Sequence, residues 1–446
     1  MNCIKKSLVC VAAATSAMFV AATPEVSNVT MTQSTGSRLV TITYELTEDA
    51  VVTLDVLTNA MPNAATGWAS IGGKAVCNAQ GAVWRKVTSA DADGNGKYTI
   101  KWRPDNSWTD EFGNGFKIAD GCAKAVVTAY ALDNTPDYMV VDITSTGGAD
   151  AQRYYPTAEF VPGGVTNGLY KTTTLLMRKI MAKDVTWTMG SVAESERMEA
   201  REATHQVTLT NNYYIGVYEV TQTQWQQVTG YNPSNFSTDR SMRPVERVSY
   251  TDIRQGKGTA NAYASASGGV YPADPYGDSF LGLLRTKTTL DFDLPSEAQW
   301  EFAARAGNGE GHWGDGSAMG NSLLTTDARL NLLGRYQYNG GGSNPAASCE
   351  VTNGTAIVGS YAPNTWGLYD VHGNVFELCL DWYADGDVIK GLNGAVNATP
   401  GTERVARGGS WKNPASFSRP AIRGKDTPTG RYASYGFRVA CTAGLR

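Results

Sequence analysis

Residues 359–381 have the sequence GSYAPNTWGLYDVHGNVFELCLD, and this stretch decides the fold. Pro363, Gly367 and Gly373 interrupt any regular period, because proline fixes φ and removes a donor while glycine permits positive φ. Aromatic and aliphatic side chains lie between these breaks. The pattern therefore predicts an irregular backbone held inside a core, whose amides and carbonyls need internal partners.

Three blocks in the second half of the chain carry a family resemblance. They are LPSEAQWEFAARAG at 294–307, NTWGLYDVHGNVFELCLDW at 364–382, and RVARGGSW…YGFRVA within 404–440. In this order they resemble the signature of the formylglycine-generating enzyme (sulfatase-modifying factor) family. The resemblance implies a loop-rich α+β domain of C-type-lectin-like fold over residues 171–446. A shared fold does not by itself imply the activity, which depends on the residues of the site.

Composition supports a β-rich protein of more than one domain. The chain has 446 residues, which predicts two or three domains. Charged residues make up 18%, and there are 48 glycines, 22 tyrosines and 11 tryptophans, a profile typical of an aromatic-packed, loop-rich protein. The net charge of −4 and the lack of a long Lys/Arg run argue against nucleic acid as a partner.

The first 22 residues are predicted to be a signal peptide. Lys5 and Lys6 supply the positive start, the apolar stretch 7–22 follows, and Val20-Ala21-Ala22 fits a small-residue cleavage site. A membrane anchor is the weaker alternative, because the apolar stretch is short for a span. No later stretch is long and apolar enough to be a transmembrane segment. The protein is therefore expected to be exported, whether periplasmic, at the cell surface or secreted.

Cleavage at that site leaves five cysteines. Export permits disulfides, and two pairings are candidates, Cys77 with Cys122 and Cys379 with Cys441. Cys349 is then left over, either buried and inert or free and reactive.

Residues 23–145 are predicted to form a β-sandwich, of immunoglobulin-like type. Polar and apolar residues alternate over 40–46 and 98–102, and further strands are expected over 125–132 and 138–143. Several short strands separated by polar turns are typical of such a sandwich. No residue in it suggests catalysis, so a spacer or docking role is expected.

Two polar segments of this half need separate interpretation. Residues 91–96, DADGNG, resemble the start of a calcium loop, but the twelfth position, which needs a bidentate acid, is Trp102. A turn between strands is therefore favoured. Residues 146–170 contain several glycines and prolines and are predicted to be a linker.

The family domain is predicted to open with strands over 185–191 and 205–221. Thr221 is then expected to cap a helix over 222–228. Ser296 and Gln299 fit a capping box. That box predicts a helix over 297–305 that ends near Gly307 and whose Glu301 is an internal hydrogen-bond partner. The glycine-rich residues 256–278 depart from the family and are predicted to be a surface loop.

The resemblance also implies a chemistry that can be tested residue by residue. The family converts a cysteine of a sulfatase peptide to formylglycine with copper held by two cysteines. The matching positions follow the Gly-Gly-Ser-Trp motif ending at Trp411, and they hold Asn413 and Ser418. Copper(I) prefers soft thiolates. These replacements argue against copper and against catalysis by that mechanism.

Two other metals are implied by relatives in the superfamily. Iron held by three histidines has no support, because His205, His312 and His372 lack a metal-ligand spacing and are expected to be structural. Calcium, which prefers oxygen ligands, remains the metal expected. The first calcium site comprises Asn374, the Val375 carbonyl and Glu377, and the second Asn331, the Leu332 carbonyl, Glu350 and Thr352. The alternative for the first site is that Asn374 and Glu377 only satisfy the turn's own backbone.

The C-terminal block suggests a binding surface in place of catalysis. Its mixture of aromatic, small polar and charged side chains is typical of adaptable binding surfaces. The residues expected to contact a ligand are Trp411, Lys412, Asn413, Ser416, Phe417, Arg431, Tyr432 and Tyr435.

The function expected from the sequence is non-catalytic recognition of an unknown peptide, protein or glycan. Three alternatives remain: an oxidase of formylglycine-generating type acting on a sulfatase cysteine, a retroelement-diversified variable ligand-binding protein, and a calcium-stabilised structural module.

Overall fold

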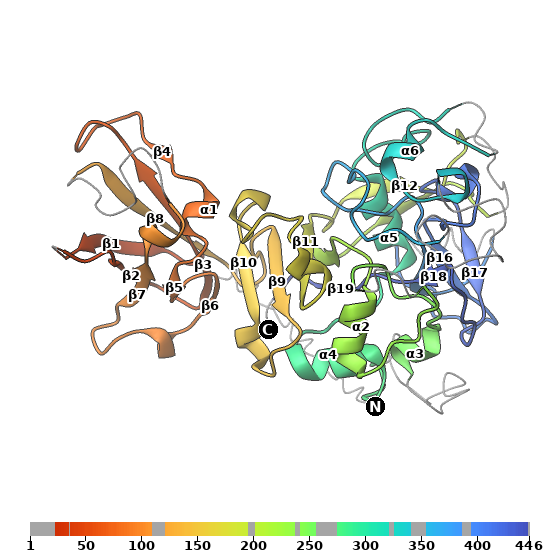
Figure 1. Cartoon of the computed structure of the whole chain (residues 1–446), viewed down its shortest axis with the longest axis horizontal. Helices are drawn as coiled ribbons and strands as arrows, with labels where there is room; N and C mark the ends of the chain where they lie inside the picture. Colours follow the sequence, from red (N-terminus) through yellow and green to blue (C-terminus); the bar gives the residue numbers. More distant parts are fainter. Residues whose placement is uncertain are drawn as a thin grey trace, which may run out of the picture.

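The computed structural model describes nine segments of the chain, which are mostly β-structure with a few short helices. These segments are 23–34, 36–108, 121–194, 201–236, 241–255, 274–320, 325–339, 354–385 and 394–444, without the side chains of residues 149 and 150. The predicted signal peptide, Cys349, Glu350, Thr352 and most of the predicted loop 256–278 lie outside them. Figure 1 shows a small β-domain at one end, a sheet beside it, and a larger domain with most of the helices beyond.

The small domain consists of two antiparallel sheets that share one hydrophobic core. The first sheet has the order β1 (Val26–Gln33), β2 (Val40–Leu46), β7 (Tyr98–Trp102) and β5 (Gln80–Gly81). In the second, β3 (Ala50–Thr58) pairs with β4 (Ala69–Ser70), β6 (Arg85–Val87) and β8 (Ala123–Tyr130). Short helical turns complete it at α1 (Gly73–Val76), η1 (Ser89–Asp91) and η2 (Pro104–Asn106). Val40, Ile42 and Tyr44 are fully buried, as the alternating pattern predicts.

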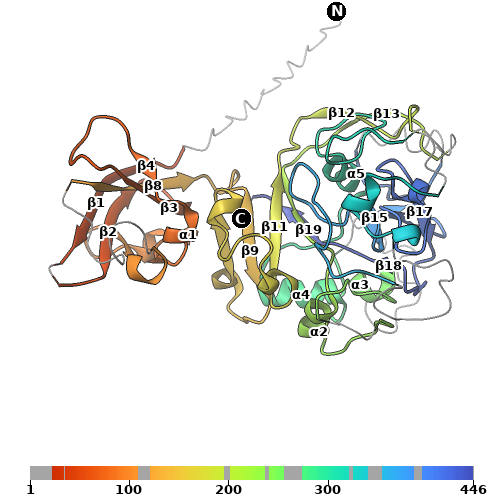
Figure 2. The same ribbon diagram turned by 45° about the horizontal axis from the view of Figure 1, so that its top comes forward.

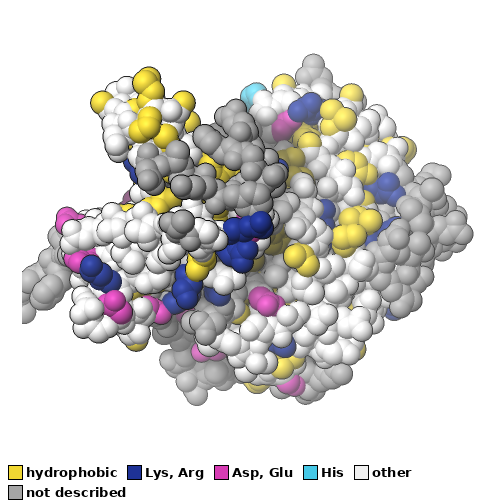
Figure 3. All heavy atoms as spheres, turned by 60° about the vertical axis from the view of Figure 1, so that its left-hand side comes forward, with side chains coloured by type: hydrophobic (Ala, Val, Ile, Leu, Met, Phe, Trp, Pro, Cys, Tyr) yellow, Lys and Arg dark blue, Asp and Glu magenta, His cyan; other side chains and the backbone are white. Residues whose placement is uncertain are grey.

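The polar segment 91–96 is a turn, as expected. Asp91 pairs with Arg85 at 2.6 Å, and one carboxylate oxygen of Asp93 accepts from the amides of Asn95 and Lys97. Figure 3, which brings this domain forward, shows hydrophobic side chains gathered at one outer corner and charges of both signs elsewhere on the described surface.

The boundary between the domains differs from the prediction. The strand expected over 138–143 forms as β9, but it belongs to a five-stranded sheet of the larger domain. The order of that sheet is β10 (Gln152–Tyr155), β9 (Tyr138–Asp142), β11 (Thr174–Ile180), β14 (Tyr213–Gly216) and β19 (Ala440–Thr442). The predicted linker 146–170 is structured, with β10 and the turns η3 (Gly148–Ala151), η4 (Ala158–Phe160) and η5 (Gly168–Lys171). Periodicity within a strand does not reveal which sheet the strand joins, so the boundary at residue 145 was wrong.

The two domains are packed together through a shared core. One cluster of buried side chains contains sandwich residues such as Trp84 and residues of the larger domain such as Tyr218 and Tyr369. Trp84 packs on Tyr155 with ring centroids 5.2 Å apart, and its carbonyl accepts from the amide of Tyr154 at 2.7 Å. Figure 2 shows the same close apposition of the sandwich and the β9–β10 region. The sandwich is thus held against its neighbour by packing.

The larger domain adds two further sheets and most of the helices. The pair β12 (Thr186–Met189) and β13 (His205–Thr208) matches the predicted strands. The other sheet has the order β17 (Gly424–Asp426), β16 (Arg404–Arg407), β15 (Phe376–Trp382) and β18 (Tyr435–Gly436). The helical segments are α2 (Gln222–Thr229), α3 (Tyr250–Arg254), α4 (Phe280–Thr288), α5 (Glu297–Arg305), α6 (Leu330–Leu333), η6 (Gln337–Asn339) and η7 (Ala415–Ser418).

The predicted helix signals are confirmed. Thr221 caps α2, and Ser296 with Gln299 forms the capping box of α5. Ala306 and Gly307 then take φ values of 50° and 82°, which end α5 in left-handed conformations. The helix α4 was not predicted.

The signature stretch is an irregular backbone inside the core, as expected. Gly373 has φ of 125°, and a Cβ there would lie 2.2 Å from the carbonyl oxygen of Arg335, so no other residue fits. The side chain of Asn364 accepts from the amides of Trp366 and Leu368. Internal partners therefore satisfy this turn, as buried backbone requires.

The expected disulfides are not formed. Cys77, Cys122, Cys379 and Cys441 are all free thiols. Cys379 and Cys441 belong to two different core clusters, which accounts for the failure of that pairing. Burial raises the pKa of the thiols of Cys379 and Cys441, so both are inert neutral groups. In the described segments, no helix combines the length and apolar character needed to cross a membrane.

Candidate functional site

A glycine turn positions the segment where the family's chemistry would lie. Gly408 and Gly409 have φ of 90° and 74°. A Cβ on Gly409 would lie 2.4 Å from the carbonyl oxygen of Phe417, so this close approach requires glycine. Beyond the turn, the amide of Trp411 donates to the carbonyl of Asn374 at 2.8 Å. The turn therefore links the signature stretch to the C-terminal block.

The two positions of the family's copper ligands are occupied by polar groups with structural contacts. The side-chain oxygen of Asn413 accepts from the hydroxyl of Ser410. The backbone amide of Asn413 donates to the carbonyl of Ser410 at 3.0 Å. Ser418 is fully buried, and its hydroxyl has no hydrogen-bond partner among the described residues. Its carbonyl accepts from Nδ1 of His372 at 3.0 Å.

These residues do not fit copper(I). An amide and a hydroxyl are hard donors, whereas copper(I) prefers thiolates. The described cysteines of the larger domain, Cys379 and Cys441, are core residues of β15 and β19. No group of three or more His, Cys, Asp or Glu side chains within the described segments is arranged to hold a metal ion.

Four of the expected contact residues form a surface, which we call the aromatic surface (Lys412, Arg431, Tyr432 and Tyr435). Tyr432 is 49% exposed. Its ring lies 5.7 Å from that of Tyr435, and Nζ of Lys412 lies 6.0 Å from its centroid. Tyr435 in turn stacks on Phe376 of β15 at 5.3 Å. The C-terminal block thus presents a row of aromatic rings supported from the core.

The two cations of the aromatic surface differ in their partners. Nε and Nη2 of Arg431 donate to the two carboxylate oxygens of Asp252 at 2.7 and 2.6 Å. Although burial acts to raise it, the hydrogen bonds from Arg431 and Ser249 hold the pKa of Asp252 below its usual value. Lys412 has no carboxylate partner among the described residues, and partial burial lowers the pKa of its ammonium. Lys412 is therefore the cation available to a ligand.

Other expected contact residues lie beneath this surface. Trp411 is 3% exposed and packs edge-on against Phe236 at 5.3 Å. Ser416 is buried, and Phe417 is partly buried against the main core. The direct ligand contacts expected of these three side chains stay a prediction, but Trp411 and Ser416 are buried in the structure, because alternation of aromatic and polar residues in an irregular segment does not reveal its buried face. They support the surface from below.

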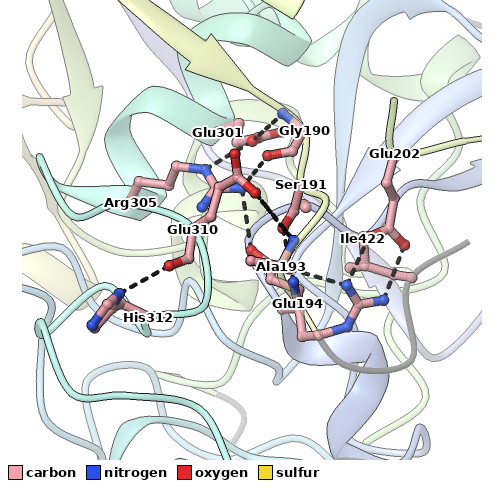
Figure 4. Close-up of polar contacts among 12 residues, drawn as sticks. Gly190, Ser191, Ala193, Glu194, Glu202, Glu301, Arg305, Glu310, His312 and Ile422 are labelled. Atoms are coloured by element: carbon pink, nitrogen blue, oxygen red, sulfur yellow. Dashed lines mark hydrogen bonds and ion pairs between the residues drawn. The ribbon is translucent and has the colours of Figure 1, made fainter. Parts of the chain in front are cut away.

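A network of buried ion pairs lies next to the same block. It joins four glutamates and four arginines: Glu194, Glu202, Glu297, Glu301, Arg305, Arg407, Arg419 and Arg423. Arg419 pairs with Glu194 at 3.0 Å and with Glu202 at 2.7 Å. Figure 4 shows another part of the network, where Arg305 lies beside Glu301 and Glu194. Glu301 accepts from the amide of Gly190 and from Arg305, which confirms its expected internal role. The opposite charges are balanced within the network, so each buried charge has a partner.

The residues of the first expected calcium site are already engaged. Glu377 accepts from Nε1 of Trp300 at 2.7 Å and from Nε and Nη2 of Arg438 at 2.6 and 2.5 Å. The side chain of Asn374 donates to Glu219 at 2.6 Å, and its oxygen accepts from a backbone amide. These partners lie outside the turn, so the two side chains do more than satisfy the turn's own backbone.

A neighbouring carboxylate keeps the calcium question open. Asp370 is fully buried, and its Oδ1 has no hydrogen-bond partner among the described residues. Burial raises the pKa of Asp370 to about 6, and burial with the charges of Asp370 and Glu377 raises that of Glu219 well above its usual value. A hard cation would relieve this excess of negative charge. Calcium at the first site therefore stays a prediction, with Asp370 as an added oxygen donor.

The second expected calcium site is not assembled from the residues that can be placed. The side-chain oxygen of Asn331 accepts from the hydroxyl of Tyr336 at 2.8 Å, and Leu332 is 54% exposed. Glu350 and Thr352 lie outside the described residues.

Each of the three histidines forms hydrogen bonds with backbone groups. Nδ1 of His205 bonds the carbonyl of Ala203, and Nδ1 of His312 that of Glu310. In His372, Nδ1 donates to Ser418 while Nε2 accepts from an amide, and burial lowers its pKa to about 4. His372 is therefore a neutral structural residue, as expected.

Sequence reasoning missed the residues that complete the aromatic surface from other elements. Asp252 and Phe376 contact it through tertiary packing, and Phe236 packs on Trp411 beneath it. Asp252 gave one local signal, as the third residue of the capping box begun by Ser249. No local pattern could indicate its pairing with Arg431, which is 179 positions away.

Comparison with known proteins identifies a family over the larger domain. A family model described as "Sulfatase-modifying factor enzyme 1-like domain" matches residues 173–443. Chaperone protein LppX of Paenibacillus barcinonensis is 30% identical over 244 residues, covering 52% of this chain and 81% of that protein. The formylglycine-generating enzyme of Thermomonospora curvata is 32% identical over 226 residues, 48% of this chain and 60% of the enzyme. The mouse formylglycine-generating enzyme is 31% identical over 153 residues, but the match spans 38% of its length.

Solved structures also match part of the chain. Treponema denticola variable protein 1 matches with 27% identity and a TM-score of 0.44, over 60% of this chain and 96% of that chain. PvdO from Pseudomonas aeruginosa matches with 23% identity and a TM-score of 0.42, over 60% and 94%.

Proposed function

Because this chain belongs to the sulfatase-modifying factor enzyme 1-like family yet lacks its copper-binding thiolates, we propose that it is an exported, non-catalytic binding protein. The observation that carries the proposal is the presence of Asn413 and Ser418 at the two ligand positions. Copper(I) chemistry needs soft ligands there. In this proposal the family domain is a scaffold, and the aromatic surface binds the ligand.

The composition of the aromatic surface suggests the class of ligand. Tyr432 and Tyr435 offer large contact areas with few rotatable bonds, which is favourable in recognition surfaces. Lys412 lacks a carboxylate partner among the described residues, while Arg431 is already paired with Asp252. We therefore favour a peptide or protein segment that places an apolar side chain beside a carboxylate. A glycan or a diversified set of ligands would require different contacts at Lys412.

The rigid support beneath the surface favours recognition. Trp411 and Ser416 are buried, and Tyr435 is stacked on a core residue. A preorganised surface loses less conformational entropy on binding. The sandwich, proposed to be immunoglobulin-like, would act as a rigid spacer because it shares a core with the family domain. Export is tested by the N-terminal sequence of the protein recovered outside the cytoplasm, which is expected to begin at Thr23.

The first experiment asks whether catalysis remains. The purified chain is incubated with copper, oxygen and a Cys-x-Pro-x-Arg peptide, and the peptide is examined by mass spectrometry. We expect no aldehyde product and no stoichiometric copper in the protein. Aldehyde formation would overturn the proposal in favour of an oxidase of the family's type.

The second experiment asks whether the aromatic surface binds. A displayed library of random peptides is selected against the protein, and selected peptides are then measured against Tyr432→Ala and Lys412→Ala. We expect enrichment of acidic peptides whose affinity falls at least about tenfold in both variants, the equivalent of one good contact. The matched control is Tyr276→Ala, which removes another exposed tyrosine, 41% exposed. Peptides that bind equally to all four proteins would locate the site elsewhere.

Structural calcium at Asn374, Val375 and Glu377 is a second, separate proposal. It is supported by the buried, unpartnered oxygen of Asp370 and by the preference of calcium for oxygen ligands. Binding would require Glu377 to share its carboxylate with Arg438. We expect calcium to raise the melting temperature in a saturable way and a chelator to reverse the rise. An unchanged melting temperature would overturn the proposed calcium site.

A further inference from the structure

A pocket lies between β12 and α5 and shares no residue with the aromatic surface. It has a volume of about 330 Å³ and is lined by Trp187, Phe302, Arg305 and the 307–310 segment. This volume falls at the lower end of the range of about 300–1,000 Å³ for small-molecule sites. The pocket is therefore large enough for one small ring-shaped ligand.

One wall of the pocket is aromatic. Trp187 comes from the exposed two-stranded sheet and Phe302 from α5, and their ring centroids are 5.3 Å apart. Trp366 packs on Phe302 from the signature stretch, also at 5.3 Å. Trp187 is only partly buried. Its ring face, which is electron-rich, is suited to C–H groups of a ligand.

Hydrogen-bond donors beside this wall have no partner among the described residues. Arg305 is 4% exposed, and its Nε and Nη2 bond to Glu301, Glu194 and the carbonyl of Gly190. Its Nη1 is buried and unpartnered, and so is Nε1 of Trp187. A buried donor without an acceptor is costly. Both nitrogens are also closed to solvent, so a ligand with acceptor oxygens satisfies them only when the side chains around them shift.

A fixed acceptor completes the pocket. Oε2 of Glu310 accepts from the hydroxyl of Ser191 and from the amides of Val192 and Ala193. Figure 4 shows Glu310 beside Ser191 and Ala193. The carbonyl of Glu310 also bonds Nδ1 of His312 at 2.9 Å. Oε1 accepts no hydrogen bond from a described residue. The carboxylate is thus held in place by one oxygen while the other remains available.

We propose that this pocket binds a neutral saccharide unit. A sugar ring has an apolar C–H face, which stacks on Trp187, and hydroxyl groups that both donate and accept. One hydroxyl donates to Oε1 of Glu310, and others accept from Nη1 of Arg305 and Nε1 of Trp187 once the side chains that cover these two nitrogens shift. The charge of Arg305 is balanced by Glu194 and Glu301, and Glu310 adds a negative charge. An anionic ligand would therefore be disfavoured.

The test follows the indole N–H resonance of Trp187 in the full chain. The protein is labelled with ¹⁵N-tryptophan, and the resonance is assigned by its loss in Trp187→Phe. Glucose, galactose, mannose and N-acetylglucosamine are titrated separately into the millimolar range. We expect at least one sugar to shift this resonance in a saturable manner, and Glu310→Gln to weaken that sugar's binding about tenfold, because hydrogen bonds to a charged acceptor are the stronger ones.

Controls separate this site from the aromatic surface and from misfolding. The remaining indole resonances report whether each variant is folded. Tyr432→Ala is expected to leave the sugar titration unchanged, so the two sites can fail independently. If none of the four sugars shifts the Trp187 resonance in the folded protein, the proposal is overturned. A shift produced by acetate or phosphate but by no sugar would also overturn it, since that result assigns an anion site.

Discussion

Two arginines of the C-terminal block make the same kind of ion pair in opposite surroundings. Arg438 pairs with Glu377 where the side chains are 0% and 1% exposed, whereas Arg431 pairs with Asp252 where they are 53% and 10% exposed. In the core, neither charge can lose its partner without remaining desolvated. At the surface, water and salt screen the attraction. The block therefore combines a scaffold that tolerates little change with a surface that can vary.

Arg438→Met tests the scaffold and carries the largest expected effect. The change leaves the carboxylate of Glu377 buried without its guanidinium partner, and it also removes the bonds that Arg438 donates to the carbonyls of Gly216 and Tyr369. We expect the free energy of unfolding to fall by about 3–5 kcal/mol, measured by urea denaturation.

The double variant Arg438→Met with Glu377→Leu controls for loss of packing. Removing both charges leaves no buried carboxylate unpaired, so part of the lost stability should return. A single variant that loses less than about 1 kcal/mol, the range of a surface pair, would abolish the contrast between the two pairs.

Asp370→Asn tests the charge excess beside Glu377. The folded-state pKa of Asp370 is about 6, raised by burial from 3.8. The folded protein therefore holds a proton between these values that the unfolded chain has released, and stability falls as pH rises from about 4 to 6. Asparagine cannot ionise, so the variant should lack this fall and gain up to about 3 kcal/mol over the wild type at pH 7.

Thermal unfolding of both proteins across pH 3.5–7.5 measures the difference. His372 contributes a slope of opposite sign, because burial lowers its pKa to about 4, but it is present in both proteins and cancels. If the stability of the two proteins changed with pH in parallel, ionisation of Asp370 would not destabilise the folded state. That result is expected if a cation is bound beside Asp370.

Asn413→Cys with Ser418→Cys tests what separates this chain from a copper protein. The change restores the two thiols and disturbs little, since Ser418 has an unpartnered hydroxyl and Asn413 loses one hydrogen bond to Ser410. We expect stability to change by about 1 kcal/mol and the double variant to bind copper(I) in a competition titration, which the wild type does not. Each single cysteine variant is the control, because one thiolate should bind the metal weakly. A double variant without copper affinity would show that the two positions do not converge.

How much of this could be predicted from the sequence depends on whether the signal was local. The glycine turns, the N-cap at Thr221 and the capping box at Ser296 formed where expected, because each depends on residues close in sequence. The sheet that β9 joins was mispredicted, since strand pairing is set by distant partners. The expected disulfide between Cys379 and Cys441 did not form for a similar reason, because the spacing of two cysteines does not show which core each side chain enters.

The candidate site divides in the same way. The positions of the missing thiolates were found from a motif within one short segment. Which aromatic side chains are exposed was not, because burial of Trp411 depends on Phe236 and exposure of Tyr432 on the packing of the segment around it. Irregular backbone has no period from which a buried face can be inferred.

Arg431→Ala tests the surface and carries the smallest expected effect on stability. The pair of Arg431 with Asp252 is half exposed and screened by solvent, so its loss should lower the free energy of unfolding by less than about 1 kcal/mol. Asp252 still accepts the hydrogen bonds from the amide and hydroxyl of Ser249, so the capping box of α3 remains. Trp411→Ala, in the same segment but buried, provides the contrast and should lose about 3–5 kcal/mol. If Arg431→Ala and Trp411→Ala were equally destabilising, the aromatic surface would be part of the scaffold, and the binding role proposed for it would lose its physical basis.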